Sequence, residues 1–129
     1  MKSTISKDFE FSASHRLEGL PDEHQCSRLH GHNYILRVII TGEVRSPGFV
    51  VDYGELKWVK GWIDGTFDHR HLNDLLDFNP TAENMSQFFA EGIYGRLVDE
   101  MGYDNIDSIS VSLSETPKTW ATSTFPQAV

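Results

Sequence analysis

Alternating hydrophobic and polar residues mark two segments of the chain. Over residues 3–15, one set of alternate positions is mostly apolar and ends in a histidine: Ile5, Lys7, Phe9, Phe11, Ala13 and His15. Over residues 107–115, Ile109, Val111 and Leu113 alternate with serines, and Glu115 continues the apolar set. A period of two is typical of a β-strand with one buried face, so we predict a strand in each segment.

Residues 30–44 form a third predicted strand, because this segment is rich in Ile, Val, Leu and Tyr. A last extended piece is predicted around residues 120–125. Between the first two strands, residues 16–29 form a polar loop that is about twice the usual connection length, and loops this long are often functional.

Two stretches have the apolar spacing of helices. The first begins at Asp52, the N-cap of a capping box with Glu55, and ends at Gly65. The second has Thr81 as its N-cap and ends at Gly102. The apolar positions of the first are Leu56, Val59, Trp62 and Ile63, and those of the second are Met85, Phe88, Phe89, Ile93, Leu97 and Met101.

The order of these elements predicts an α+β fold, in which an antiparallel sheet carries two helices on one face. Residues 67–74, between the helices, are predicted to be irregular. We expect residues 1–129 to form one domain, since the chain is too short for two and has no repeat or linker-like stretch. The other sheet face is polar, with the serines of the last strand beside Asn33, Arg37 and Thr41. It either faces solvent or lines a wet barrel interior.

Composition excludes several classes of function. The net charge of −8 argues against nonspecific nucleic-acid binding, where a basic face supplies most of the affinity. We expect no membrane segment, because the longest apolar stretch is short and is broken by Arg37. The first residues lack the apolar run of a signal peptide, and the single cysteine suits a reducing compartment. We therefore expect a cytoplasmic protein.

Three histidines are predicted to converge at one end of the sheet. His30 and His32 lie two residues apart on one strand and so share a face. If the first two strands are antiparallel neighbours, His15 at the end of the first lies beside the start of the second. Neutral imidazoles suit Zn²⁺, with other transition metals chemically possible, and three protein ligands leave a position for water or substrate.

Cys26 lies four residues before His30 and has two interpretations. As a fourth ligand it would make the zinc structural, although such sites usually hold several thiolates. As a free thiol near a zinc ion and Arg28, it would be a competent base or nucleophile.

Motifs along nearly the whole chain resemble the 6-pyruvoyl-tetrahydropterin synthase family. They are Ser14-His15-Arg16-Leu17, Cys26-x-x-x-His30-Gly31-His32, Val51-Asp52-Tyr53-x-Glu55-Leu56-Lys57, Phe67-Asp68-His69-x-x-Leu72-Asn73, Pro80-Thr81-x-Glu83-Asn84 and Glu115-Thr116. The three residues between Cys26 and His30 resemble the branch of the family that forms a carboxy product, since the pyruvoyl-forming branch typically has a longer spacer.

The resemblance implies a substrate, a metal and a set of site residues. The substrate would be 7,8-dihydroneopterin triphosphate, converted to 6-carboxytetrahydropterin with release of acetaldehyde and triphosphate, a step of queuosine biosynthesis. The resemblance assigns zinc to His15, His30 and His32. It assigns catalysis to Cys26, Asp68 and His69, and pterin anchoring to Glu115, with Thr81 and Glu83 as secondary candidates. Arg16, Arg28 and Arg70 flank the site and are candidates for the triphosphate.

The same residues also have plainer interpretations. Asp68-His69 is typical of a turn with a solvated histidine, and adjacent residues rarely point the same way, so the two need not be hydrogen-bonded. Glu115 alone would be a strand-end charge. Thr81 and Glu83 are a helix cap and a favourable first-turn charge. His24 is expected at the surface, and so is His71, which could also support the site.

The family's fold, the tunnelling fold, implies that protomers join their sheets into a barrel with active sites between subunits. We therefore expect a trimer-based homo-oligomer, a hexamer. Two other functions compete with the carboxy-forming reaction: 6-pyruvoyl-tetrahydropterin synthesis, and a noncatalytic zinc- or pterin-binding role with Cys26 on the metal. A zinc hydrolase would need a carboxylate base beside a metal-bound water, and no motif supplies one.

Overall fold

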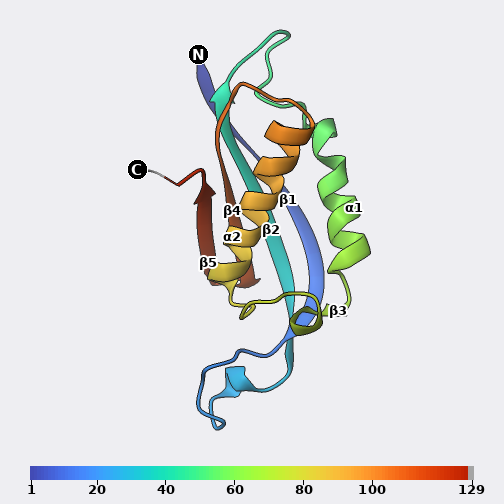
Figure 1. Ribbon diagram of the computed structural model, residues 1–129, viewed down its shortest axis with the longest axis vertical. Helices are drawn as coiled ribbons and strands as arrows, with labels where there is room; N and C mark the ends of the chain where they lie inside the picture. Colours follow the sequence, from blue (N-terminus) through green and yellow to red (C-terminus); the bar gives the residue numbers. More distant parts are fainter. Residues whose placement is uncertain (128–129) are drawn as a thin grey trace.

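Within residues 1–127, the chain folds into a five-stranded sheet with two helices on one face (Figure 1). The computed structural model describes residues 1–127. The strands are β1 (Lys2–His15), β2 (His30–Glu43), β3 (Arg70–His71), β4 (Ile106–Thr116) and β5 (Thr119–Phe125), and the helices are α1 (Lys57–Thr66) and α2 (Ala82–Tyr94). This confirms the predicted α+β class.

The strand order is β3-β1-β2-β4-β5. β1 pairs with β2, β2 with β4 and β4 with β5, all antiparallel, while the short β3 runs parallel to β1. Residues 67–74 were predicted to be irregular, and this was wrong for Arg70 and His71 because both pair with β1. β5 confirms the extended piece predicted around residues 120–125.

Both alternating patterns bury their apolar side chains against the helices. Phe9 and Phe11 of β1 and Val111 and Leu113 of β4 are all buried in one core. The helices contribute most of their predicted stripes, since Val59, Ile63, Met85, Phe89 and Ile93 are buried in the same core. Met101, predicted as part of the second stripe, lies beyond the helix and is exposed. One apolar face of the sheet, covered by two amphipathic helices, therefore accounts for most of the core.

The helix ends depart from prediction at two points. Asp52 is a cap, but its carboxylate accepts the amide of Gly54 and caps a 3-10 turn, Tyr53–Leu56, from which α1 continues. α1 also includes Gly65, which was predicted to end it. For α2 the prediction holds at the start, where Thr81 Oγ1 accepts the amide of Asn84. A π-helical segment, Gly95–Glu100, continues α2 towards Gly102.

The face of the sheet away from the helices is polar. Arg37 forms an ion pair with Asp8 at 2.8 Å, and hydroxyl pairs link β4 to β5, Ser110 with Thr124 and Ser112 with Thr122. Within residues 1–127, no helix combines the length and the apolar character needed to cross a membrane.

Candidate metal centre and surrounding site

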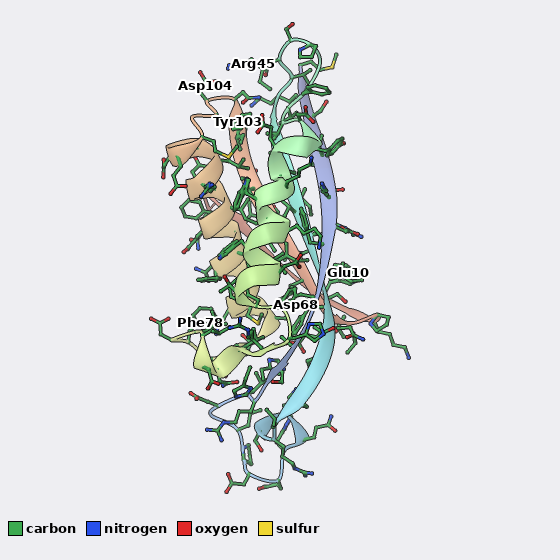
Figure 2. All side chains as sticks on the ribbon, turned by 90° about the vertical axis from the view of Figure 1, so that its right-hand side faces the viewer. Glu10, Arg45, Asp68, Phe78, Tyr103 and Asp104 are labelled. Carbon is green, nitrogen blue, oxygen red and sulfur yellow. The ribbon has the colours of Figure 1, made fainter. Side chains whose placement is uncertain are left out.

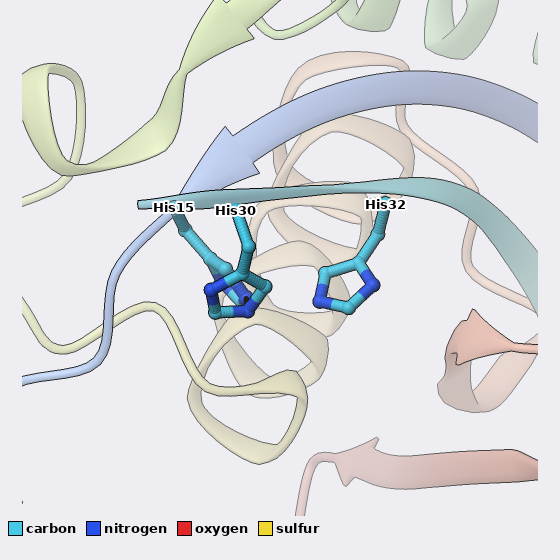
Figure 3. A group of neighbouring side chains, drawn as sticks. All are labelled: His15, His30 and His32. Atoms are coloured by element: carbon cyan, nitrogen blue, oxygen red, sulfur yellow. Dashed lines mark hydrogen bonds between the residues drawn. The ribbon is translucent and has the colours of Figure 1, made fainter. Parts of the chain in front are cut away.

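Three histidines meet where β1 ends and β2 begins (Figure 3). The antiparallel register places His15 opposite His30 and Ala13 opposite His32, so all three imidazoles leave the same face of the sheet. One ligand nitrogen from each ring lies within 4.8 Å of the other two. The predicted convergence is confirmed, and a metal ion could be held by this group.

Backbone carbonyls fix the orientation of two of these rings. His15 Nδ1 lies 2.8 Å from the carbonyl oxygen of Pro80, and His30 Nδ1 lies 2.7 Å from that of Arg28. A carbonyl can only accept, so each Nδ1 must carry the proton, and each Nε2 then presents a lone pair. The two Nε2 atoms are 3.0 Å apart. Two lone pairs facing each other at this distance repel unless a proton or a cation lies between them.

The third ring completes a donor set that suits a metal ion. His32 Nε2 is buried and has no hydrogen-bond partner among the described residues. Burial lowers the pKa of His15 from 6.5 to about 4 and, together with the charge of His30, lowers the pKa of His32. The rings of His15 and His32 are therefore neutral near pH 7, as ligand imidazoles must be. The residues present fit a cation such as zinc.

Glu115 lies next to this cluster. Its Oε2 is 3.6 Å from His32 Nε2, and its side chain is 22% exposed. Burial raises the pKa of this carboxyl; the charge of His30 opposes this rise, and the charge of Glu83 adds to it. Tyr34, stacked on Phe11 with ring centroids 4.8 Å apart, brings its hydroxyl oxygen to 3.2 Å from His15 Nδ1. Glu115 thus lies on the helix-covered face, as its alternation with Leu113 predicted.

Asp68 and His69 lie side by side as a carboxylate–imidazole pair at the outer edge of β1. Asp68 Oδ1 accepts the amide of Ser12 at 2.9 Å, and Asp68 Oδ2 lies 3.0 Å from His69 Nδ1. The adjacent side chains can meet because His69 has a positive φ of 59°. The Ser12 amide, and after it His69, lowers the pKa of Asp68. Figure 2 shows Asp68 near β1, far along the molecule from Arg45 and Asp104.

A cavity of about 740 Å³ joins several of these groups. Its lining includes His32, Asp68 and Glu115, together with Ser12 and Asn33 from the polar face of the sheet. This volume lies within the usual range for small-molecule sites. The end of the sheet that carries the histidines therefore also carries a hollow large enough for a small molecule.

Comparison with known proteins identifies the family. Residues 4–125 match the family described as 6-pyruvoyl tetrahydropterin synthase. The chain belongs to this family. The predicted resemblance is thereby confirmed.

Proteins with several different names are similar to this chain. The 6-carboxy-5,6,7,8-tetrahydropterin synthase of Rickettsia bellii is 32% identical over 133 residues, which cover 87% of this chain and 93% of the relative. The dihydroneopterin monophosphate aldolase of Pyrococcus furiosus is 36% identical over 97 residues, which cover 75% of this chain and 80% of the relative. The structure of Caenorhabditis elegans 6-pyruvoyl tetrahydropterin synthase superposes with a TM-score of 0.70 at 29% identity, covering 99% of this chain and 97% of that one.

Other family-motif residues lie outside the histidine cluster. Cys26 lies in a 3-10 turn, Gln25–Ser27, of the long loop, which extends beyond the end of the sheet (Figure 1). Its thiol is not part of the group of ligand atoms within 4.8 Å found among residues 1–127. No hydrogen bond or ion pair within that range joins Asp68 or His69 to the three histidines. One chain therefore brings the three histidines and Glu115 together, but it does not bring the thiol to them.

The remaining candidates have clear positions. Thr81 caps α2 directly after Pro80, whose carbonyl orients His15, and Glu83 is exposed in the first turn of α2. Arg28 has an exposed side chain, and its carbonyl orients His30. Sequence reasoning missed the orienting role of both carbonyls, because a backbone acceptor leaves no signal in residue type.

Proposed function

We propose that this protein is a 6-carboxy-5,6,7,8-tetrahydropterin synthase. It converts 7,8-dihydroneopterin triphosphate to 6-carboxy-5,6,7,8-tetrahydropterin and releases acetaldehyde and triphosphate. The observation that carries the proposal is the group of three imidazoles beside the half-buried carboxyl of Glu115, at one end of the sheet. Family membership and a relative of that name over most of the chain support it.

His15, His30 and His32 hold zinc in this proposal. The ring orientations of His15 and His30, the neutral state of His15 and His32, and the buried Nε2 of His32, which has no hydrogen-bond partner among the described residues, all suit a cation bound by three nitrogens. When bound, zinc supplies a Lewis acid that stabilises negative charge on the oxygens of the substrate side chain.

Glu115 anchors the pterin. A dihydropterin presents a ring N–H and an amino group side by side, and one carboxylate can accept both hydrogen bonds. The raised pKa of Glu115 reflects burial that a bound pterin with paired donors would compensate. Thr81 and Glu83, at the start of α2, are secondary contacts in this proposal, since Glu83 is close enough for its charge to raise the pKa of Glu115.

Cys26 and the Asp68–His69 pair move protons. Asp68 holds His69 Nδ1, which leaves His69 Nε2 free to give or take a proton at the substrate side chain. The thiolate of Cys26 takes a proton at the opposite side. Because one chain leaves Cys26 outside the group formed by the three histidines, we propose that the site is shared between subunits of a trimer-based oligomer, a hexamer, in the cytoplasm.

Product analysis tests the reaction. Purified protein with zinc and 7,8-dihydroneopterin triphosphate should yield acetaldehyde and the carboxy product by mass spectrometry. A pyruvoyl product without acetaldehyde would instead support the second candidate, 6-pyruvoyl-tetrahydropterin synthesis, which the likeness to the Caenorhabditis elegans structure favours. An aldol cleavage, as the name of the Pyrococcus relative would imply, leaves phosphate on the released aldehyde.

Replacement of Cys26 separates catalysis from metal binding. Cys26→Ala should retain zinc and lose activity by about 10²–10⁴-fold, the usual scale for a general base. Loss of zinc together with stability would mean that the sulfur is a ligand, and the noncatalytic role would then be favoured.

Mixed oligomers test the shared site. Cys26→Ala and His69→Ala subunits, each inactive alone, should regain part of the activity when they are refolded together, because some sites would combine an intact Cys26 with an intact His69. No recovery, with mixed oligomers verified by mass spectrometry, would place both groups of each site on one chain.

The triphosphate contacts are tested through KM. Arg28→Ala and Arg70→Ala should each raise the KM for the substrate with little change in kcat. Unchanged KM values in both variants would remove these residues from the proposed site.

A further inference from the structure

Two asparagines each pair with both backbone groups of one residue at the start of the long loop. Asn73 Oδ1 accepts the amide of Arg16 at 2.9 Å, and Asn73 Nδ2 donates to the carbonyl of Arg16 at 2.9 Å. Asn79 forms the same two hydrogen bonds with Glu18: its Oδ1 accepts the amide at 2.9 Å, and its Nδ2 donates to the carbonyl at 3.0 Å. A primary amide has one acceptor and donors in a plane, as a peptide group has, so the two side chains replace a neighbouring strand. We call these four hydrogen bonds the asparagine clamp.

The clamped segment is directly bonded to Cys26. Leu17 lies between the two clamped residues, and its amide donates to the carbonyl of Cys26 at 2.8 Å. The turn at Cys26 is itself closed by His24, whose Nδ1 accepts the Cys26 amide at 3.0 Å. Residues 16–18 are thus held by asparagines on one side and hold the cysteine turn on the other.

The loop has little else to order it. Pro21, Asp22, Glu23, His24 and Gln25 are all exposed, and Cys26 is only partly buried. Hydrophobic burial therefore cannot fix this segment as it fixes the strands. Its position depends on polar contacts, and the clamp supplies the four that tie its base to another part of the chain.

The other side of the clamp belongs to the segment that carries further site residues. Asn73 follows Asp68 and His69 by a few residues and lies next to the buried Leu72. Asn79 directly precedes Pro80, whose carbonyl orients His15. The carbonyl of Asn79 also accepts the Nδ2 of Asn84 in α2. The clamp thus connects the cysteine loop to a segment anchored in the core and adjacent to the histidine cluster.

We propose that Asn73 and Asn79 are positioning residues, which hold the loop of Cys26 in the one arrangement that presents the thiol for catalysis. The proposal rests on the proposed function for the role of Cys26. Aspartate would retain the acceptor but would set a carboxylate oxygen against a carbonyl, and alanine would remove both bonds.

The test combines hydrogen exchange with kinetics on the zinc-loaded full chain. We expect Asn73→Ala and Asn79→Ala each to speed amide exchange in residues 16–28 by about tenfold, and the double variant by more, with exchange in β1 and β2 unchanged. In each variant kcat should fall by about tenfold or more at nearly constant KM, with zinc content as in the wild type. For Asn73→Asp, both the exchange rate of residues 16–28 and kcat should lie between those of the wild type and those of Asn73→Ala.

The single cysteine gives an independent readout of the loop. Iodoacetamide can alkylate only Cys26, so its rate reports directly on that thiol. We expect the alkylation rate to change in both alanine variants in step with the exchange rate. Asn105→Ala is the matched control, because Asn105 also donates to two carbonyls, those of Glu43 and Val50, but at the other end of the sheet. It should lower thermal stability without altering alkylation or kcat.

Two results would overturn the proposal. Unchanged exchange in residues 16–28 of the double variant would show that the clamp does not order the loop. Faster exchange with unchanged kcat would show that loop order does not position Cys26. Failure of the proposed function is a separate result, since it appears as absent synthase activity in the wild-type protein, whereas the exchange and alkylation readouts need no turnover.

Discussion

Acidification of the metal-free protein should destabilise it through His15, and the size of the effect follows from the burial of this ring. His15 is 0% exposed. Burial, helped by the nearby histidines, lowers its pKa from 6.5 to about 4, against the opposing effect of the hydrogen bond to Pro80. The folded protein therefore resists protonation of a group that the unfolded chain protonates readily.

The sign and magnitude follow from proton binding. Between pH 6.5 and about 4, the unfolded chain binds a proton at His15 that the folded protein does not bind, so the free energy of unfolding falls as the pH falls. The gap between the two pKa values corresponds to about 3 kcal/mol. This stability is present above pH 6.5 and is lost once the pH has fallen through about 4.

A comparison with His15→Gln isolates this effect. Glu115 acts in the opposite direction, because its raised pKa favours the folded state at acid pH, so the wild-type curve alone mixes both groups. Urea unfolding with a chelator, followed by tryptophan fluorescence at fixed protein concentration, should be measured from pH 7 to pH 4. The wild type should lose about 3 kcal/mol more than His15→Gln over this range. Parallel curves for the two proteins would refute the reasoning.

Three further predictions concern the metal and two backbone positions. Zinc at about a thousandfold above its Kd should raise the free energy of unfolding by about 4 kcal/mol, and His32→Ala should lose most of this gain in the same urea assay. Gly42→Ala should lower Tm, because a Cβ at this position would clash with the backbone carbonyl oxygen of Asn105, and an unchanged Tm would contradict this contact. Thr81→Ala should cost about 1 kcal/mol through loss of the α2 cap, whereas Thr81→Ser should retain most of it; equal losses in both would exclude the cap as the cause.

The long elements could be predicted from sequence because each has a regular period. Alternation over residues 3–15 and 107–115 specified strands and their buried faces, and the apolar stripes specified two helices. β3 could not be predicted, since two residues carry no period and are extended only because they pair with β1. The end of α1 was misplaced because glycine has a low helix propensity, yet the helix continues through Gly65 to Thr66.

The functional site, too, could be predicted from the sequence only in part. Convergence of the three histidines followed from strand geometry, because an antiparallel connection places the end of one strand beside the start of the next. Contact between Asp68 and His69 did not follow, since it depends on the positive φ of His69. Nor did the asparagine clamp, because asparagine is an ordinary loop residue and nothing in its sequence position shows that it pairs with Arg16 or Glu18.

The histidine cluster also has a consequence for folding. A slip of one residue in the pairing of β1 with β2 would turn His15 to the opposite face from His30. A metal ion coordinated by all three rings would therefore favour only the native alignment of β1 with β2. Metal present during refolding would therefore disfavour chains in which these two strands are misaligned.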